Sequence, residues 1–137
     1  MSLFHVFEIS GSALAAQGVR LNTIASNLAN AEVVSGSAAD AFRSRHPIFT
    51  TAYATAMSQR QAVGVRVDGI VESTAPPRQR YSPSHPLADS QGFIYMSNVN
   101  PVEEMANMIS ASRSYQSNIE AMNTTKELIM RTLSLGS

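Results

Sequence analysis

The 137-residue chain has no cysteine, few charged residues and no long apolar run. The absence of cysteine excludes disulfides and thiolate metal sites. Charged residues make up only 15% of the chain and ten basic residues balance ten acidic ones, so we do not expect nucleic acid as a partner. No stretch approaches the roughly 20 apolar residues of a membrane span. The N-terminus lacks a basic leader and Glu8 interrupts its apolar residues, so we expect no Sec-type signal peptide.

Proline is also absent from residues 4–31, where apolar residues recur with heptad spacing. One row of the heptad is large and the row four positions later is small. Glycine inside a helix costs about 1 kcal/mol relative to alanine, so two glycines in one row predict that another backbone comes close. We therefore predict an N-terminal helix that ends near Asn30 and Ala31. Its large row is Phe7, Leu14, Leu21 and Leu28, and its small row is Gly11, Gly18 and Ala25.

Residues 101–135 predict a second long helix. Asn100 is a capping residue, Pro101 suits the first helical position, and Glu103 and Glu104 lie near the positive end of the helix dipole. Gly136 supplies a stop signal. Large apolar residues recur at alternating steps of three and four, with Ser112 and Lys126 filling two steps. These residues are Met105, Met108, Tyr115, Ile119, Met122, Ile129 and Leu133.

The middle of the chain predicts a small, loop-rich β module without a large core of its own. Alternation at residues 64–73 indicates a strand, and residues 46–57 indicate another less clearly. Four prolines between residues 74 and 93 exclude a helix there. The sequence "DSQG" at 89–92 predicts a turn that leads into a short strand at 93–97.

These patterns predict a mainly α fold with a small β-rich insertion. The long N- and C-terminal helices would pair as a coiled-coil-like bundle, because a single helix of either length is marginal in water. The predicted zones are the N-terminal helix of a helical core domain at 1–31, an inserted β-rich module at 32–100, and the C-terminal helix of the core domain at 101–137.

Both predicted helices carry apolar or small residues outside their main seams. Two paired helices leave their outer faces wet, so a second apolar face indicates more neighbours than one chain supplies. We therefore predict that other subunits cover these faces. The additional positions are Ile9, Ala13, Ala16, Val19 and Ile24 in the first helix, and Val102, Ile109, Leu128 and Leu135 in the second.

No pattern of catalytic or ligand-binding residues stands out. The three histidines lack the spacing of a metal-ligand set, and "SGSA" at 10–13 lacks that of a nucleophile elbow. We expect no enzyme activity, cofactor or metal. Two alternatives remain open: a soluble adaptor whose helix pair docks a partner helix, and a small metal-dependent enzyme that uses His46, His85 and Asp89.

Several separate motifs resemble the bacterial flagellar rod and hook proteins. "ISGSALAAQGVRLNTIASNLANAE" at 9–32 is similar to the N-terminal signature of that family, with "SNLAN" as its most recognisable part. "GVRVDGIVES", "YSPSHPLADSQGF" and the segment from "NVNPVEEM" onward resemble the proximal rod members, in the same order and nearly end to end. The SNLAN residues are Ser26, Asn27, Leu28, Ala29 and Asn30.

The resemblance implies a non-enzymatic building block of the rod, the shaft that transmits torque from motor to hook. Members of the family leave the cell through the flagellar type III export apparatus without a cleaved signal and assemble in the periplasmic space. The implied partners are copies of the chain itself and the axial proteins FlgB, FlgF, FlgG and FliE. We expect the β module, with its Arg-rich loops, to lie outside the helical core.

Overall fold

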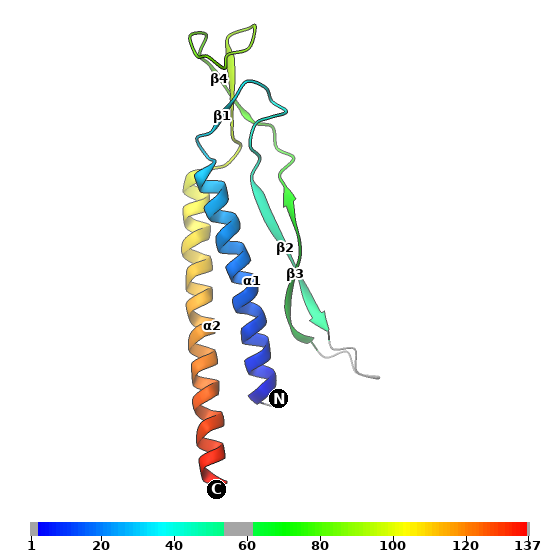
Figure 1. The fold of residues 1–137 in the computed structure, drawn as a ribbon, viewed down its shortest axis with the longest axis vertical. Coiled ribbons are helices and arrows are strands. Elements are labelled where there is room, and N and C mark those ends of the chain that lie inside the picture. The colour runs from blue at the N-terminus through cyan, green and yellow to red at the C-terminus, as the bar shows by residue number, and fades with distance from the viewer. Residues whose placement is uncertain (1–2, 54–61, 137) are drawn as a thin grey trace. The chain divides into compact units, whose positions relative to one another are not determined.

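The computed structural model describes residues 3–53 and 62–136. Within these residues, the chain order is one helix, five strands and a second helix (Figure 1). The helices are α1 (Leu3–Ala29) and α2 (Pro101–Leu135), close to the predicted bounds. The strands are β1 (Val34–Ser35), β2 (Arg45–Tyr53), β3 (Ala62–Glu72), β4 (Arg78–Tyr81) and β5 (Phe93–Met96). The predicted order of a helix, a small β region and a second helix is therefore confirmed.

Polar side chains mark the predicted helix ends. The side-chain amide of Asn30 donates a hydrogen bond of 2.8 Å to the carbonyl of Ser26, and the backbone N–H of Asn30 donates to the same carbonyl at 3.2 Å. The Asn100 side chain accepts from the N–H of Val102 at 3.2 Å. These bonds satisfy backbone groups that have no partner inside a helix.

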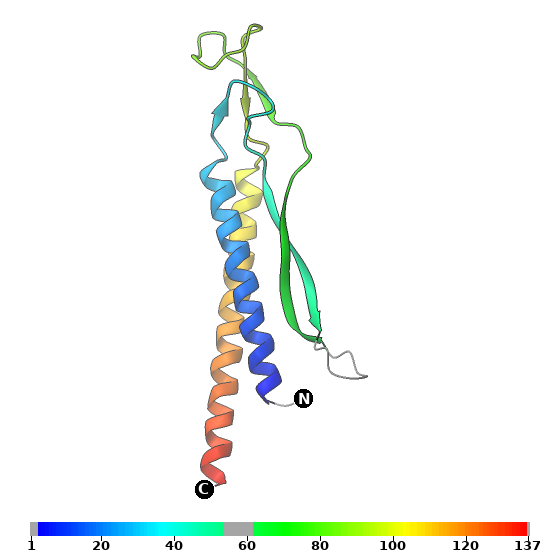
Figure 2. The same ribbon diagram turned by 45° about the vertical axis from the view of Figure 1, so that its right-hand side comes forward.

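The strands form two small antiparallel arrangements. In the first, β5 lies between β1 and β4, with Met96 opposite both Val34 and Arg78. In the second, β2 pairs with β3, and Figure 2 shows the two strands as a long ribbon. The predicted strand at 64–73 is confirmed as part of β3, and the "DSQG" turn does lead into β5. The less clear strand is confirmed as β2 as far as Tyr53; its predicted residues 54–57 lie outside the described residues.

The chain divides into two compact units. Unit 1 comprises Met1–Leu21, Pro47–Gly69 and Ser110–Ser137, and unit 2 comprises Asn22–His46 and Ile70–Ile109. Each unit therefore takes a segment of both helices. The predicted boundaries at residues 31 and 100 stay a prediction.

The apolar core of unit 2 is small. Ile94 of β5 and Val99, which precedes α2, are its largest fully buried apolar side chains. Ile24, Ala31 and Ala41 complete its buried apolar residues. Asn27 and Ser97 are buried as completely as Ile94. Since an apolar core of this size contributes limited stability, the buried polar groups have to be well satisfied.

In unit 1, β3 approaches the backbone of α1 very closely. The hydroxyl of Ser12 accepts a hydrogen bond of 3.1 Å from the N–H of Val65 and donates one of 2.7 Å to the carbonyl of Ile9. Gly64 has a φ of +149°, and a Cβ built there would lie 2.9 Å from Cβ of Ser12. Glycine is thus needed at position 64 for this helix–strand contact.

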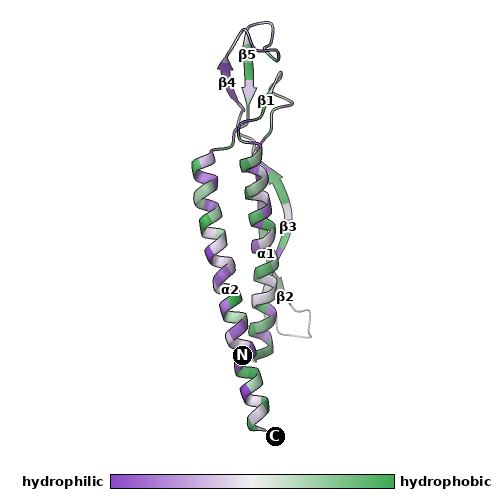
Figure 3. Cartoon of the chain, turned by 60° about the vertical axis from the view of Figure 1, so that its left-hand side comes forward, coloured by the Kyte–Doolittle hydropathy of each residue, from purple (hydrophilic) through white to green (hydrophobic). Residues whose placement is uncertain are grey.

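The buried row of α2 lies one position earlier than the sequence pattern predicts. Glu104, Ala111 and Thr125 are buried and lie seven and fourteen residues apart, with half-buried Asn118 at the heptad position between the last two. The predicted members Met105 and Ile119 of the neighbouring row are exposed. Figure 3 shows hydrophobic and hydrophilic residues interspersed along α2. Small or hydrogen-bonded side chains occupy the buried row, and larger apolar ones are left outside. The other predicted row, Met108, Tyr115, Met122 and Ile129, is half-buried.

Neither helix of the described chain combines the length and apolar character that crossing a membrane requires. The polar residues distributed along α1 and α2 account for this finding.

Gly92 gives a first test of the fold, because its backbone has a φ of +85° and it is buried. A Cβ there would lie 2.9 Å from the Tyr81 ring and 3.1 Å from Cβ of Pro83. Gly92→Ala is expected to lower the free energy of unfolding by roughly 2–4 kcal/mol through backbone strain and overpacking. Urea denaturation followed by circular dichroism measures it. Gly69→Ala, where a Cβ meets no described atom within 4 Å, is the control; equal midpoints for the two variants would contradict the prediction.

Candidate functional site

The side-chain amide of Asn27 lies at the centre of a polar junction in unit 2. Its Oδ1 accepts a hydrogen bond of 2.9 Å from the N–H of Arg45, and its Nδ2 donates one of 2.9 Å to the carbonyl of the same residue. Nδ2 also donates to Oε2 of Glu104 at 3.1 Å. The amide thus bonds both backbone groups of Arg45, the first residue of β2, as a neighbouring strand would. Its bond to Glu104 also links it to the start of α2.

The sequence around Asn27 explains why its side chain is presented in this way. Asn27 lies in the last turn of α1 and is fully buried. Asn30 closes the helix on Ser26, and Ala31 then turns the chain with an N–H bond of 3.2 Å to the carbonyl of Leu28. The SNLAN motif therefore combines a buried side-chain connector with a helix stop.

Glu104 reaches the junction because Asn100 fixes the start of α2. The N–H of Glu104 donates to the carbonyl of Asn100 at 3.0 Å, which closes the first turn. The Glu104 side chain is only 4% exposed. A buried carboxylate needs hydrogen-bond donors, and Asn27 supplies one. Removal of the Asn27 amide therefore leaves part of a buried acid unsatisfied.

A second asparagine joins further segments of unit 2 in the same way. Oδ1 of Asn98 accepts from the N–H of Ser44 at 2.7 Å, and its Nδ2 donates to the carbonyl of Ala75 at 2.9 Å. The carbonyl of Ser44 in turn accepts from the N–H of Ser73 at 2.8 Å. These bonds satisfy backbone groups where the chain enters β2 and leaves β3.

Arg78 and Arg45 have different roles in this unit. Nε of Arg78 donates to the carbonyl of Ser97 at 2.9 Å, so this arginine links β4 to the segment before α2. Arg45 forms an ion pair with Glu72 at 3.0 Å, but both side chains are about half exposed. An exposed pair of this kind contributes less than about 1 kcal/mol. The backbone of Arg45 therefore matters more to the junction than its charge does.

Asp89 organises the turn before β5. One carboxylate oxygen accepts from the N–H groups of Gln91 and Phe93, both at 2.9 Å, and the other accepts from the Tyr95 hydroxyl at 3.0 Å. Led by the Phe93 N–H, these bonds lower the pKa of Asp89 below its ordinary value of 3.8, although partial burial opposes them. The bond to Asp89 also raises the pKa of Tyr95 above 10.0.

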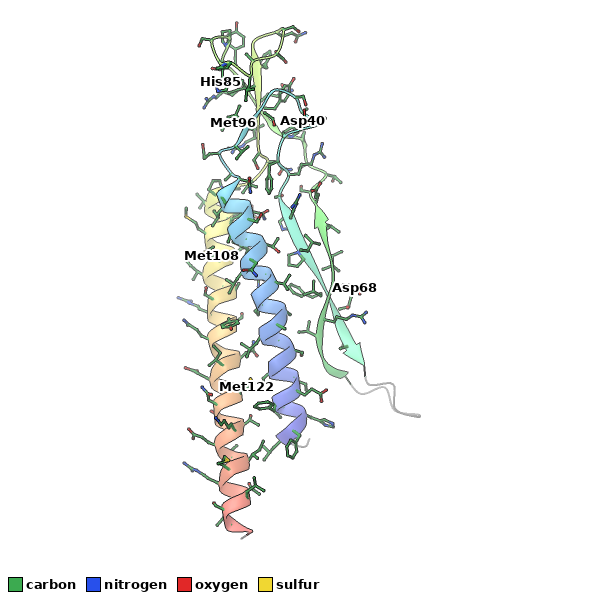
Figure 4. All side chains as sticks on the ribbon, viewed as in Figure 1. Asp40, Asp68, His85, Met96, Met108 and Met122 are labelled. Atoms are coloured by element: carbon green, nitrogen blue, oxygen red, sulfur yellow. The ribbon has the colours of Figure 1, made fainter. Side chains whose placement is uncertain are left out.

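The proposed metal ligands of the enzyme alternative do not form a site. Figure 4 shows His85 in the loop between β4 and β5. Among the described residues, no group of three or more histidine, aspartate or glutamate side chains could hold a metal ion. The carboxylate of Asp89 is already engaged by its own turn.

The structure separates the predicted seam and motif residues by exposure, while their role in assembly stays a prediction. Ile24 and Asn27 are buried. The half-buried members are Gly11, Leu14, Gly18, Leu21, Ser26, Leu28, Asn30, Met108, Tyr115, Met122 and Ile129. The exposed members are Phe7, Ala25, Ala29, Met105, Ile109, Ile119 and Leu133.

The predicted close approach to the glycine row does not occur among the described residues of the chain. A Cβ built at Gly11 or at Gly18 meets no described atom within 4 Å. The close helix–backbone contact is made at Gly64 on Ser12 instead. Among the described residues, nothing therefore fills the space beside Gly11 and Gly18 on this face of α1.

Sequence reasoning missed the residues that hold unit 2 together. Asn27 was singled out as a motif residue without a structural role, and neither Glu104 nor Asn98 was expected to bond a distant segment. Their partners lie 77 and 54 positions away for the Asn27–Glu104 and Ser44–Asn98 bonds. The signal that could have found Asn27 is the presence of an uncharged polar residue on the buried side of an otherwise apolar helix.

Comparisons with known proteins agree with this arrangement of motifs. The family described as "Flagella basal body rod protein" matches residues 7–44, and "Flagellar basal body rod FlgEFG protein C-terminal" matches residues 90–135. A "Flagellar basal-body rod protein FlgC" of Yersinia enterocolitica is 48% identical over 136 residues, 99% of each chain. Proteins of the same name from Salmonella typhimurium and Buchnera aphidicola (Acyrthosiphon pisum) are 47% and 39% identical, over 99% and 98% of each chain.

The Asn27 junction gives a second test. Asn27→Asp keeps an acceptor for the Arg45 N–H but removes both donated bonds and places a carboxylate beside Glu104. We expect the free energy of unfolding to fall by roughly 2–4 kcal/mol. Asn22→Asp, on the exposed side of α1, is the matched control and should change it by less than about 0.5 kcal/mol.

Adding Glu104→Gln to Asn27→Asp should recover part of the loss, because the new amide can donate to the new carboxylate. Urea denaturation of the single and double variants measures the coupling. Strictly additive effects would show that the two side chains do not interact.

The Asp89 turn gives a pH prediction. Because its pKa is lowered on folding, Asp89 stabilises the turn above pH 3.8, and this contribution is lost as the pH falls below that value. The amide proton resonances of Gln91 and Phe93 should therefore titrate below pH 3.8. Asp89→Asn should abolish this titration at both amides; an unchanged profile in the variant would assign it to another group.

Proposed function

The chain belongs to the FlgC family of flagellar basal-body rod proteins, and from this membership we propose that it builds the rod by packing its terminal helices against neighbouring axial subunits. It is a structural subunit of the rod and not an enzyme.

The observation that carries the proposal is the exposed apolar surface at the start of α2. Val102, Met105 and Ile109 are 75%, 56% and 58% exposed. They recur at steps of three and four, so they share one face of the helix. A single chain gains nothing by presenting such a face to water. A neighbouring subunit would gain ~1.5–3 kcal/mol for each of these side chains that it buried fully.

The open face of α1 supports the same proposal. Gly11 and Gly18 weaken an isolated helix by about 1 kcal/mol each relative to alanine, and no described part of the chain uses the space that they provide. The close approach of a neighbouring backbone would compensate for this cost. The small residues of α1 and the large apolar residues of α2 would then form two different surfaces, each of which contacts a neighbouring subunit.

Contacts between two different surfaces suit a shaft. When one surface of a subunit binds another surface of the next subunit and the rotation does not close, the assembly grows as a helix. Helices of 27 and 35 residues supply long, stiff elements. We propose that the assembled helices transmit torque from the motor to the hook. Pairing of α1 with α2 as a coiled coil, within a helical core that flanks an inserted β module, belongs to the same proposal.

The proposed partners are copies of the chain and the axial proteins FlgB, FlgF, FlgG and FliE. We also propose export through the flagellar type III apparatus without a cleaved signal, and assembly in the periplasmic space. Membership of the rod family supports both statements. No observation favours the soluble adaptor over the rod subunit, because the same open helix faces would suit neighbouring subunits of the rod.

Ile109→Asp tests whether the exposed face of α2 makes assembly contacts. Because Ile109 is 58% exposed, the purified variant should keep the circular dichroism spectrum and urea midpoint of the parent. In cells that carry it as their only copy, rods, hooks and swimming should be lost, because a charge would be buried in the contact. Electron microscopy of basal bodies and motility in soft agar measure the outcome.

Ser110→Asp is the matched control, since it introduces the same charge at the next exposed position of α2. It should affect assembly much less than Ile109→Asp does. Normal rods and swimming with Ile109→Asp would reject the proposed contact surface. Loss of the folded state in the purified variant would show that Ile109 acts within the chain.

A further inference from the structure

We draw no further inference here: the strongest candidate, the open face of α1 at Gly11 and Gly18 in unit 1, is a stripe of small residues, and nothing in the described structure shows what covers it beyond the subunit contacts already proposed.

Discussion

Unit 2 depends on one buried carboxamide, that of Asn27. Its oxygen and nitrogen satisfy the N–H and carbonyl of Arg45, and its second N–H reaches Glu104. Only a side chain with both an acceptor and two donors, at this length, can make all three bonds. An aspartate lacks the donors and a leucine would leave the backbone of Arg45 unpaired. The junction thus explains physically why the SNLAN motif has asparagine at this position.

Beyond that junction, α2 reverses the usual arrangement in which large apolar side chains are buried and small or polar ones are exposed. The buried positions of α2 hold Glu104, Ala111 and Thr125, whereas Met105 and Ile109 are exposed. The buried hydroxyl of Thr125 donates a hydrogen bond of 2.8 Å to the carbonyl of Ala121. Internal packing therefore relies on small side chains and hydrogen bonds, and the larger apolar side chains remain available on the surface. Such a distribution suits a subunit whose apolar surface is completed by its neighbours.

Local signals made much of this fold predictable. Asn100, Pro101 and the acidic pair mark the start of α2, and "DSQG" marks the turn that Asp89 organises. The junction was not predictable, because Asn27 meets Arg45 and Glu104 across 18 and 77 positions without a local pattern. The displaced row on α2 has a similar cause. Hydrophobicity singled out Met105, whereas close packing and hydrogen bonding favour Glu104 and Ala111.

The absence of cysteine allows the most direct measurement of the central claim, which is that neighbouring subunits cover these outer helix faces. Gly18→Cys and Ile109→Cys each introduce a single thiol on an open face. Maleimide should label both thiols readily in the purified chain and leave both protected in purified basal bodies, with Ser110→Cys as a control position on α2. Equal labelling of Gly18→Cys and Ile109→Cys in the isolated chain and in intact basal bodies would contradict the account.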